Sequence, residues 1–225
     1  MKTVSTSHKF LAAPEPATSV QGKAAGRADD HTARREHTRK LILKAALDIA
    51  IAQGWSALSM RKVADRISYT APIIYEHFSN KAAMIGQLTQ QGFDKLLAQI
   101  LRAETTAQRA DEKVLAMWLA YADFAFSNST LYKAMFGLQI QQQSNTVTQA
   151  AALSNAFLPS IFNLNPNNNT DTALIKSFNS YWCWVHGMIS ISLVYDQQPS
   201  IEDRAVLIDS ITSITNSIIQ QKKSA

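Results

Sequence analysis

The sequence predicts an all-α fold, and three observations lead to that prediction. The 225 residues include only 7 glycines and 6 prolines, and no Asn-Gly or Asp-Gly pair marks a β-hairpin. Hydrophobic residues make up 46% of the chain and charged residues 17%, which is enough apolar surface for a large core without staples. Apolar residues also recur at helical spacing. We therefore expect about nine helices, arranged as a small N-terminal domain and a larger C-terminal domain.

The first 33 residues differ in composition from the rest. They mix Ala, Thr, Ser, Pro and Gly without an apolar period, which predicts a disordered tail over residues 1–33. The apolar run Phe10-Leu11-Ala12-Ala13 is too short for the core of a signal peptide. The lone Cys183 excludes an intramolecular disulfide and fits a reducing compartment. We therefore expect a cytoplasmic protein with domains at 34–83 and 84–225.

The charge of the chain is concentrated in one segment. Residues 34–81 hold nine Lys and Arg against four Asp and Glu, so that this segment alone carries the net charge of +5 found for the whole chain. Such asymmetry is typical of a protein with one end that meets a polyanion such as nucleic acid. A solvated charged surface explains the charge alone equally well.

The basic segment reads as three helices in succession. The first helix ends at Gly54, which accepts the left-handed conformation of a helix end. Ser59 is expected to cap a short second helix, and Pro72 fits the first turn of a third helix that Thr70 caps. Ser79 is expected to cap a fourth. The third helix should carry Ala71, Ile74, Tyr75 and Phe78 on its inner side. Two short helices after a longer basic one are typical of a helix-turn-helix that reads the major groove.

Several positions carry a family resemblance. The motif Tyr75-x-His77-Phe78-x-Asn80-Lys81, together with Ala45-Ala46 upstream, resembles the DNA-binding domain of the tetracycline-repressor (TetR/AcrR) family over residues 42–84. Farther on, Trp182-x-x-x-His186-Gly187 resembles the signature of the subgroup named for a Trp-His-Gly (WHG) motif. The family usually has glycine where Ser68 stands and a small aliphatic residue at Tyr69. We therefore expect a strained or altered turn before the recognition helix.

The resemblance implies which residues meet DNA. Phosphate contacts are implied for Ser59, Thr70, Tyr75, His77 and Lys81, and Arg34 and Arg35 are candidates for an arm along the backbone or in the minor groove. The edge facing the bases would be Thr70, Ala71, Pro72 and Ile73, with Arg61 nearby. We expect apolar contacts with thymine methyl groups and Arg61 at a guanine. The alternatives are a core role for Tyr75 and a solvated helix end for His77.

The larger domain is expected to bind a ligand and a second subunit. Helices are predicted at about 88–101, 107–128, 130–142, 146–162, 171–195 and 200–221, the last with a capping box at Ser200 and Asp203. The charge-free stretch 177–195 reads as a buried helix rather than a membrane span. The resemblance favours a dimer interface, and the residues predicted to line it are Ile189, Leu193, Leu207, Ile211, Ile214 and Ile218. Intrachain core is the alternative.

Aromatic residues gather in this domain. They are most often ordinary core, but the family encloses an effector pocket in the same region. The predicted lining is Trp118, Tyr121, Phe136, Phe157 and Trp182. His186 is expected to be a buried, hydrogen-bonded residue rather than a metal ligand, because Cys183 is its only soft partner nearby. We predict no metal and no cofactor.

The function implied by these features is that of a ligand-responsive, sequence-specific transcription regulator. The resemblance implies a homodimeric repressor, associated with the nucleoid, that a small lipophilic effector releases from a palindromic operator. No membrane partner is expected. A non-specific or architectural DNA binder is the first alternative. An all-α enzyme is the second, although the chain has no His-Glu-x-x-His, Gly-rich phosphate loop or Gly-x-Ser-x-Gly motif.

Overall fold

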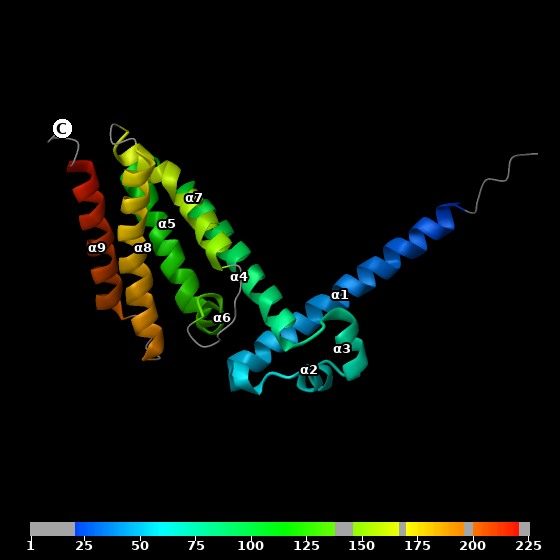
Figure 1. Cartoon of the computed structure of the whole chain (residues 1–225). Helices are drawn as coiled ribbons and strands as arrows, with labels where there is room; N and C mark the ends of the chain where they lie inside the picture. Colours follow the sequence, from blue (N-terminus) through cyan, green and yellow to red (C-terminus); the bar gives the residue numbers. More distant parts are fainter. Residues whose placement is uncertain (1–20, 138–145, 167–169, 196–199, 221–225) are drawn as a thin grey trace, which may run out of the picture. The chain divides into compact units, whose positions relative to one another are not determined.

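The structure, a computed structural model, describes residues 21–137, 146–166, 170–195 and 200–220 (Figure 1). Within these ranges it contains nine α-helices and one 3-10 turn, and no strand. The all-α prediction is therefore confirmed. Residues 1–41 and 42–225 form two separate compact units, and the packing described below concerns the second unit.

The N-terminal helices are α1 (Gln21–Gln53), the 3-10 turn η1 (Trp55–Ala57), α2 (Met60–Arg66) and α3 (Ala71–His77). Helix α1 begins at Gln21, so residues 21–33, predicted as disordered tail, are helical. The segment holds four alanines, the best helix former, and no proline follows Pro16 until Pro72, so nothing in it stops the helix from extending backwards. Residues 1–20 lie outside the described ranges.

Most of the helix starts predicted from the sequence occur in the structure. The Ser59 hydroxyl caps α2 by accepting a hydrogen bond from the Lys62 backbone N–H at 3.2 Å, and Pro72 lies in the first turn of α3. Thr70 occupies the cap position of α3 without a side-chain capping bond. The cap of α4 is Asn80, whose Oδ1 accepts from the Ala83 N–H at 2.8 Å, and not Ser79. The carboxamide reaches the third residue of the helix from one position closer than the serine.

The turn between α2 and α3 contains a residue in the left-handed backbone conformation, although that residue is not glycine. Ser68 has a φ of 59° and is the one non-glycine residue with positive φ in the described ranges. An L-residue with a Cβ is strained in this region of backbone space. The expectation of a strained turn is confirmed at the residue where the family usually has glycine.

Replacing Ser68 with glycine is expected to stabilise the protein by about 1 kcal/mol, because relief of left-handed strain exceeds the added entropy of the unfolded chain. Chemical denaturation of wild type and Ser68→Gly measures the difference. Ser79→Gly serves as the control, since Ser79 has no positive φ and gains nothing from glycine. Equal free energies for wild type and Ser68→Gly would contradict strain at this turn.

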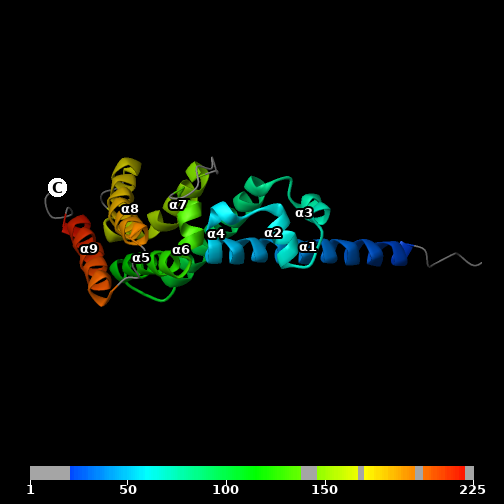
Figure 2. The ribbon, with the colours of Figure 1, turned by 90° about the horizontal axis from the view of Figure 1, so that it is seen from below.

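The C-terminal domain is a bundle of helices (Figures 1 and 2). Its elements are α4 (Lys81–Glu104), α5 (Ala110–Ser127), α6 (Ser129–Met135), α7 (Thr146–Leu164), α8 (Asp171–Val194) and α9 (Ile201–Gln220). Helix α5 lies at the centre and contacts α4, α6, α7, α8 and α9. This position explains why α5 is apolar on more than one face.

Two helix ends differ from the predictions. Helix α6 ends at Met135 instead of residue 142, because Gly137 adopts a left-handed φ of 69°; residues 138–142 lie outside the described ranges. Helix α7 continues through Pro159 to Leu164, past the predicted end at residue 162. The capping box of α9 is confirmed by reciprocal bonds between Ser200 and Asp203, at 2.9 and 3.1 Å.

Helices α4 and α6 pack closely at a glycine. A Cβ added at Gly92 would lie 2.6 Å from the sulfur of the buried Met135 and 3.2 Å from Leu131. By contrast, a Cβ at Gly86, two turns earlier on α4, would meet nothing within 4 Å. Gly92 therefore permits the close approach of the two helices.

The two glycines supply a matched pair of variants. Gly86→Ala is expected to stabilise the protein by about 0.5–1 kcal/mol, because alanine is the better helix former. Gly92→Ala is expected to lose that benefit and to cost about 1–2 kcal/mol instead, because Met135 must move within a packed core. Thermal unfolding of both variants measures the contrast. A Gly92→Ala protein as stable as Gly86→Ala would contradict the close packing.

No helix in the described part of the chain is both long enough and apolar enough to cross a membrane.

Candidate DNA-binding surface and aromatic cluster

Every predicted DNA-binding residue is at least partly accessible to solvent. Those that are exposed are Arg34, Arg35, Ser59, Arg61, Thr70, Pro72 and Tyr75, and those that are half-buried are Ala71, Ile73, His77 and Lys81. The Tyr75 side chain is 56% exposed, whereas Ile74 and Phe78 are buried in the core. Tyr75 therefore does not lie on the inner side of α3, and the prediction of a core position for it is wrong.

The first turn of α3, which is predicted to face the bases, combines an exposed polar position with apolar ones. Thr70 is exposed and makes no capping bond with its side chain, and Pro72 and Ile73 follow it on the first turn. Arg61, on the first turn of α2, is exposed as well. This set offers a hydroxyl, a guanidinium and apolar contacts to a groove of DNA.

Lys81 has a structural contact that sequence reasoning missed. Its Nζ donates to the backbone carbonyl of Trp55 at 2.6 Å and to that of Ser56 at 3.4 Å. The first residue of α4 is thereby tied to η1. A phosphate at Lys81 would have to share the ammonium group with these carbonyls, which leaves one of its three donors for DNA.

Trp55 links η1 to α6 within the second compact unit. Its side chain is buried, and its indole Nε1 donates to the backbone carbonyl of Thr130 in α6 at 3.1 Å. The same residue accepts from Lys81 through its carbonyl. The signal in the sequence was an aromatic residue directly after the helix-ending Gly54, but periodicity alone does not reveal its partner in α6.

The residues predicted to line a pocket lie together in a packed aromatic cluster. Trp118, Tyr121 and Phe157 are fully buried, and Phe136 and Trp182 are partly buried and packed against the core. The ring of Trp118 stacks on Phe157 at a centroid distance of 4.1 Å, and the Tyr121 ring lies 5.6 Å from Trp182. The structure brings the five residues together, with neighbouring rings in close contact.

At one end of this cluster is a hydrogen-bonded group of three side chains. Tyr121 Oη lies 2.8 Å from Tyr132 Oη, and both hydroxyls lie within reach of His186 Nδ1, at 3.0 and 2.5 Å. Burial raises the pKa of both tyrosines well above its ordinary value and lowers the pKa of His186. All three groups are therefore uncharged near neutral pH. Hydrogen bonding of His186 is as predicted; the role of Tyr132 was missed.

The lowered pKa of His186 makes stability depend on pH. As the pH falls below about 6.5, His186 of the unfolded chain takes up a proton before His186 of the folded chain does. The unfolded state then binds more protons, so the free energy of unfolding decreases toward acid pH. We expect His186→Gln to show a shallower decrease between pH 7 and pH 5, measured by denaturation at several pH values. An identical pH profile in both proteins would contradict the burial of a neutral imidazole.

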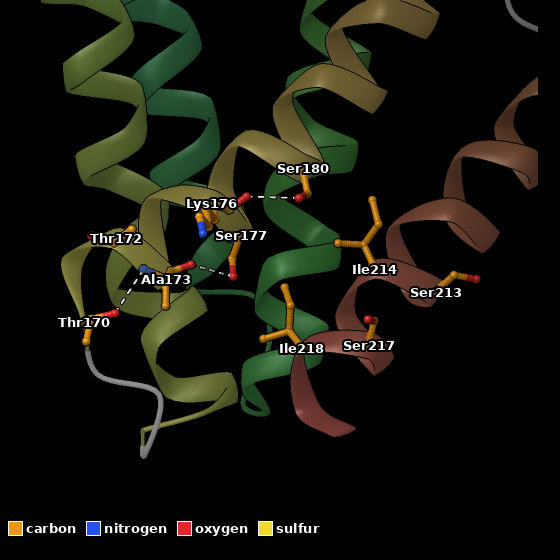
Figure 3. Close-up of a pocket in the computed structure, with 10 residues that line it drawn as sticks. All are labelled: Thr170, Thr172, Ala173, Lys176, Ser177, Ser180, Ser213, Ile214, Ser217 and Ile218. Carbon is orange, nitrogen blue, oxygen red and sulfur yellow. Dashed lines mark hydrogen bonds between the residues drawn. The ribbon is translucent and has the colours of Figure 1, made fainter. Parts of the chain in front are cut away.

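A separate hollow of about 620 Å³ lies between the first half of α8 and the second half of α9 (Figure 3). Its lining carries hydroxyl groups, one cation and two isoleucines: Thr170, Thr172, Ala173, Lys176, Ser177, Ser180, Ser213, Ile214, Ser217 and Ile218. Ser177 and Ser180 donate to carbonyls of their own helix, at Ala173 and Lys176. None of the five predicted pocket residues lines this hollow.

The residues predicted to line the dimer interface are mostly buried within one chain. Ile189, Leu193, Leu207, Ile211 and Ile218 are at most 7% exposed, and Ile214 is partly buried. Their seam packs α9 against α5 and α8 of the same molecule. The burial supports the alternative, intrachain core, and corrects the predicted interface, because the 4-3-4 spacing marks an apolar face without naming its partner.

The described residues contain no group of three or more His, Cys, Asp or Glu side chains placed to hold a metal ion.

Comparisons with known proteins agree with this architecture. A model of bacterial regulatory proteins of the tetR family matches residues 42–88, and a model of the tetracyclin repressor-like C-terminal domain matches residues 114–212. The chain is 25% identical over 130 residues to the HTH-type transcriptional activator FasR of Mycolicibacterium smegmatis, a match that covers 58% of this chain and 59% of FasR. The alignment thus spans less than two thirds of that relative.

Two further similarities cover most of the chain. It is 23% identical over 203 residues to the uncharacterized HTH-type transcriptional regulator Rv0681 of Mycobacterium tuberculosis, covering 89% of this chain and 91% of that protein. A solved tetR-family regulatory protein from Rhodococcus RHA1 has the same fold, with a TM-score of 0.59, 14% identity, and coverage of 80% and 96%. With both of its domains matched by tetR-family models, the chain belongs to the TetR family of bacterial regulatory proteins.

Proposed function

We propose that the protein is a ligand-responsive, sequence-specific DNA-binding transcription regulator, with α3 as the recognition helix. The observation that carries the proposal is the exposed set of Arg61 on the first turn of α2, Thr70 at the cap of α3 and Tyr75 within α3, in the segment matched as tetR-type. Thr70, Ala71, Pro72 and Ile73 are proposed to face the bases. Ser59, Thr70, Tyr75, His77 and Lys81 are proposed to meet phosphates, with Arg34 and Arg35 as an arm.

A homodimer is part of the proposal. Its interface is formed by exposed residues of α8 and not by the buried seam of α9. Trp184, Ile191 and Tyr195 are 45%, 62% and 71% exposed, and their spacing places them on one side of α8. A Cβ at Gly187, beside that face, would meet nothing within 4 Å. A second α8 packed on this face would bury apolar surface around a two-fold axis. Two heads related by that axis fit a palindromic operator.

The oligomeric state tests this surface. Sedimentation of the wild type is expected to show a dimer, and Ile191→Glu a monomer, because two buried carboxylates would face one another across the axis. Lys176→Glu changes charge on the same helix away from this face and is expected to remain dimeric. A dimeric Ile191→Glu protein would exclude the proposed face.

Effector binding is proposed for the aromatic cluster of Trp118, Tyr121, Phe136, Phe157 and Trp182. A small lipophilic molecule bound there would favour one of two conformations and so change operator affinity. We propose repression released by the effector; since the relative FasR is named an activator, the direction is decided by measurement. Assignment to the WHG subgroup and action in the cytoplasm on nucleoid DNA are further parts of the proposal.

A gel shift tests DNA binding directly. The full chain is titrated into DNA from upstream of its own gene and into a scrambled sequence of the same length and composition, at moderate salt. Sequence-specific regulation predicts binding to the first at least 100-fold tighter, taken as about 3 kcal/mol or more. Equal binding to both would favour an architectural DNA binder. Loss of all binding would favour a non-DNA function, including the all-α enzyme.

A further inference from the structure

The Phe136 ring occupies the middle of a cage of other rings. Its centroid is 4.6 Å from the His186 ring and 4.7 Å from the Tyr132 ring. Its other neighbours are Phe93, Trp182 and Tyr121, at 5.3, 5.8 and 6.5 Å. Phe136 follows the last residue of α6, precedes the left-handed Gly137 and is only partly buried. The rings therefore surround a space of the size of one phenyl ring. The side chain of Phe136, which follows the end of α6, occupies it.

Beside this ring, the hydrogen-bonded group Tyr121–Tyr132–His186 has one donor hydrogen too many. If Nδ1 of the neutral His186 accepts, both tyrosine hydroxyls donate within the group and the Nε2–H remains. If Nδ1 carries the hydrogen and donates, only one of the two hydroxyls finds an acceptor inside the group. In either tautomer one donor points to an acceptor outside the three side chains.

Two buried polar atoms on the same helices, α5 and α8, lack partners. The indole Nε1–H of the fully buried Trp118 has no hydrogen-bond acceptor, and its ring lies edge-to-face with Tyr121 at 5.7 Å. The buried Ser190 Oγ, one helical turn after His186 on α8, has no partner either. Buried polar groups are nearly always paired, so the unpaired indole N–H of Trp118 in the aromatic cluster indicates a missing acceptor.

Within the described ranges, the fully buried surroundings hold no permanently charged side chain. None of the fully buried residues among those described is an Asp, Glu, Lys or Arg. An ammonium ion in this cluster would lose its hydration without gaining a buried counter-ion, and a carboxylate would have to protonate His186, whose pKa burial lowers. The complementary polar group is therefore an uncharged oxygen acceptor.

We propose that the cage around Phe136 binds a small aromatic molecule with an uncharged oxygen acceptor, such as a ketone, ester or amide carbonyl. The ring of this ligand takes the place of the Phe136 ring among Tyr132, Trp182 and His186. The carbonyl oxygen accepts from the surplus donor of the tyrosine–histidine group or from the Trp118 indole. The proposal gives the effector of the proposed function its chemical class.

Four probes with one phenyl ring and different head groups test the class: acetophenone, ethylbenzene, benzoate and benzyltrimethylammonium. Affinities for the full chain are measured by tryptophan fluorescence and thermal shift. Acetophenone is expected to bind about three- to tenfold tighter than ethylbenzene, the effect of one hydrogen bond, and both ions are expected to bind more weakly. An ion that binds as tightly as acetophenone, equal binding of acetophenone and ethylbenzene, or binding by none of the four would overturn the proposal.

Three variants locate the site. Phe136→Ala removes the competing ring and is expected to bind acetophenone roughly tenfold tighter, because the wild type must first displace that ring. Trp118→Phe and Tyr132→Phe each delete one polar hydrogen and keep a ring; at least one should weaken binding about threefold or more. Tyr69→Phe, which also deletes one polar hydrogen and keeps a ring, changes an exposed residue before α3; it is the control and should bind as the wild type does. Circular dichroism verifies that each variant folds.

The inference rests on the proposed function only where it calls the ligand an effector. Probe binding is measured without DNA and the gel shift without probe, so each can fail while the other succeeds. Acetophenone is finally added to the gel shift at saturation. A change in operator affinity, in either direction, is expected; unchanged affinity with the probe bound would overturn the assignment of the cage as the effector site. Probe affinities unchanged in Phe136→Ala, Trp118→Phe and Tyr132→Phe alike would place binding elsewhere and overturn it as well.

Discussion

Replacing Arg61 with alanine is expected to remove the preference for one base pair in each half-site of the operator. Arg61 stands exposed on the first turn of α2, and no described partner competes for its guanidinium. A bidentate contact from arginine to the O6 and N7 of guanine discriminates against other bases by about 1–3 kcal/mol. A dimer makes this contact twice, so the total loss on the correct operator is about 2–6 kcal/mol if the half-sites are independent.

The measurement compares affinities for the operator and for a set of operators with each base pair changed in turn. With Arg61→Ala, one pair of symmetric positions should become indifferent to sequence while the others keep their effect. Arg66→Ala removes the same charge from the last turn of α2 and is the matched control. A phosphate role for Arg61 would appear differently: affinity would fall equally for all sequences, and the salt dependence would become less steep by about one ion per contact.

The sequence alone predicts the helices well because their signals are local. The capping box of Ser200 and Asp203, the cap at Ser59 and the Pro72 helix start all depend on neighbours within four residues, and all three occur. The cap at Asn80 instead of Ser79 shows the limit of such signals, since two good capping residues stand side by side. Where a capping residue marks it, local rules place a helix end to within a residue or two. The start of α1 at Gln21 and the end of α6 at Met135 were missed by more than that.

Partners across the fold are less predictable from sequence. The seam from Leu207 to Ile218 was identified as an apolar face, but burial shows that the same chain covers it. Likewise, no pattern indicated that Trp55 donates to Thr130, 75 residues away, or that Tyr132 bonds to His186, 54 residues away. A hydrophobic period specifies that a face is buried and leaves open which helix, in which subunit, covers it.

The aromatic cluster is an intermediate case. The five residues proposed for a pocket do lie together, because α5 is central and brings Trp118 and Tyr121 toward α7 and α8. The sequence could not show how closely the rings of this cluster lie to one another. The distances from the Phe136 ring to the Tyr132 and His186 rings, 4.7 and 4.6 Å, underlie the proposal that Phe136 stands in the place of a ligand ring.

Replacing Trp118 with alanine is expected to destabilise the protein by about 3–5 kcal/mol, as for other large aromatic residues removed from a core. Trp118 is fully buried, and its ring contacts join α5 to α7 and α8 through Phe157, Phe178 and Tyr181, at 4.1, 5.8 and 5.6 Å. Deletion would leave the stacked rings without a common partner. For a chain of this size the melting temperature should fall by roughly 6–20 °C.

The cost should depend on the ring and not on the indole nitrogen. Trp118→Phe keeps an aromatic face for Phe157 and deletes the N–H that has no acceptor, so its loss of stability should be well below that of Trp118→Ala. Ile175→Ala, at a residue 49% exposed on α8, should change stability by less than about 1 kcal/mol. If Trp118→Phe were as unstable as Trp118→Ala, the indole N–H would have to be engaged in the folded protein, and the surplus of donors in the cluster would disappear. The stability series therefore tests the same unpartnered group on which the ligand class depends, by a measurement that needs neither ligand nor DNA.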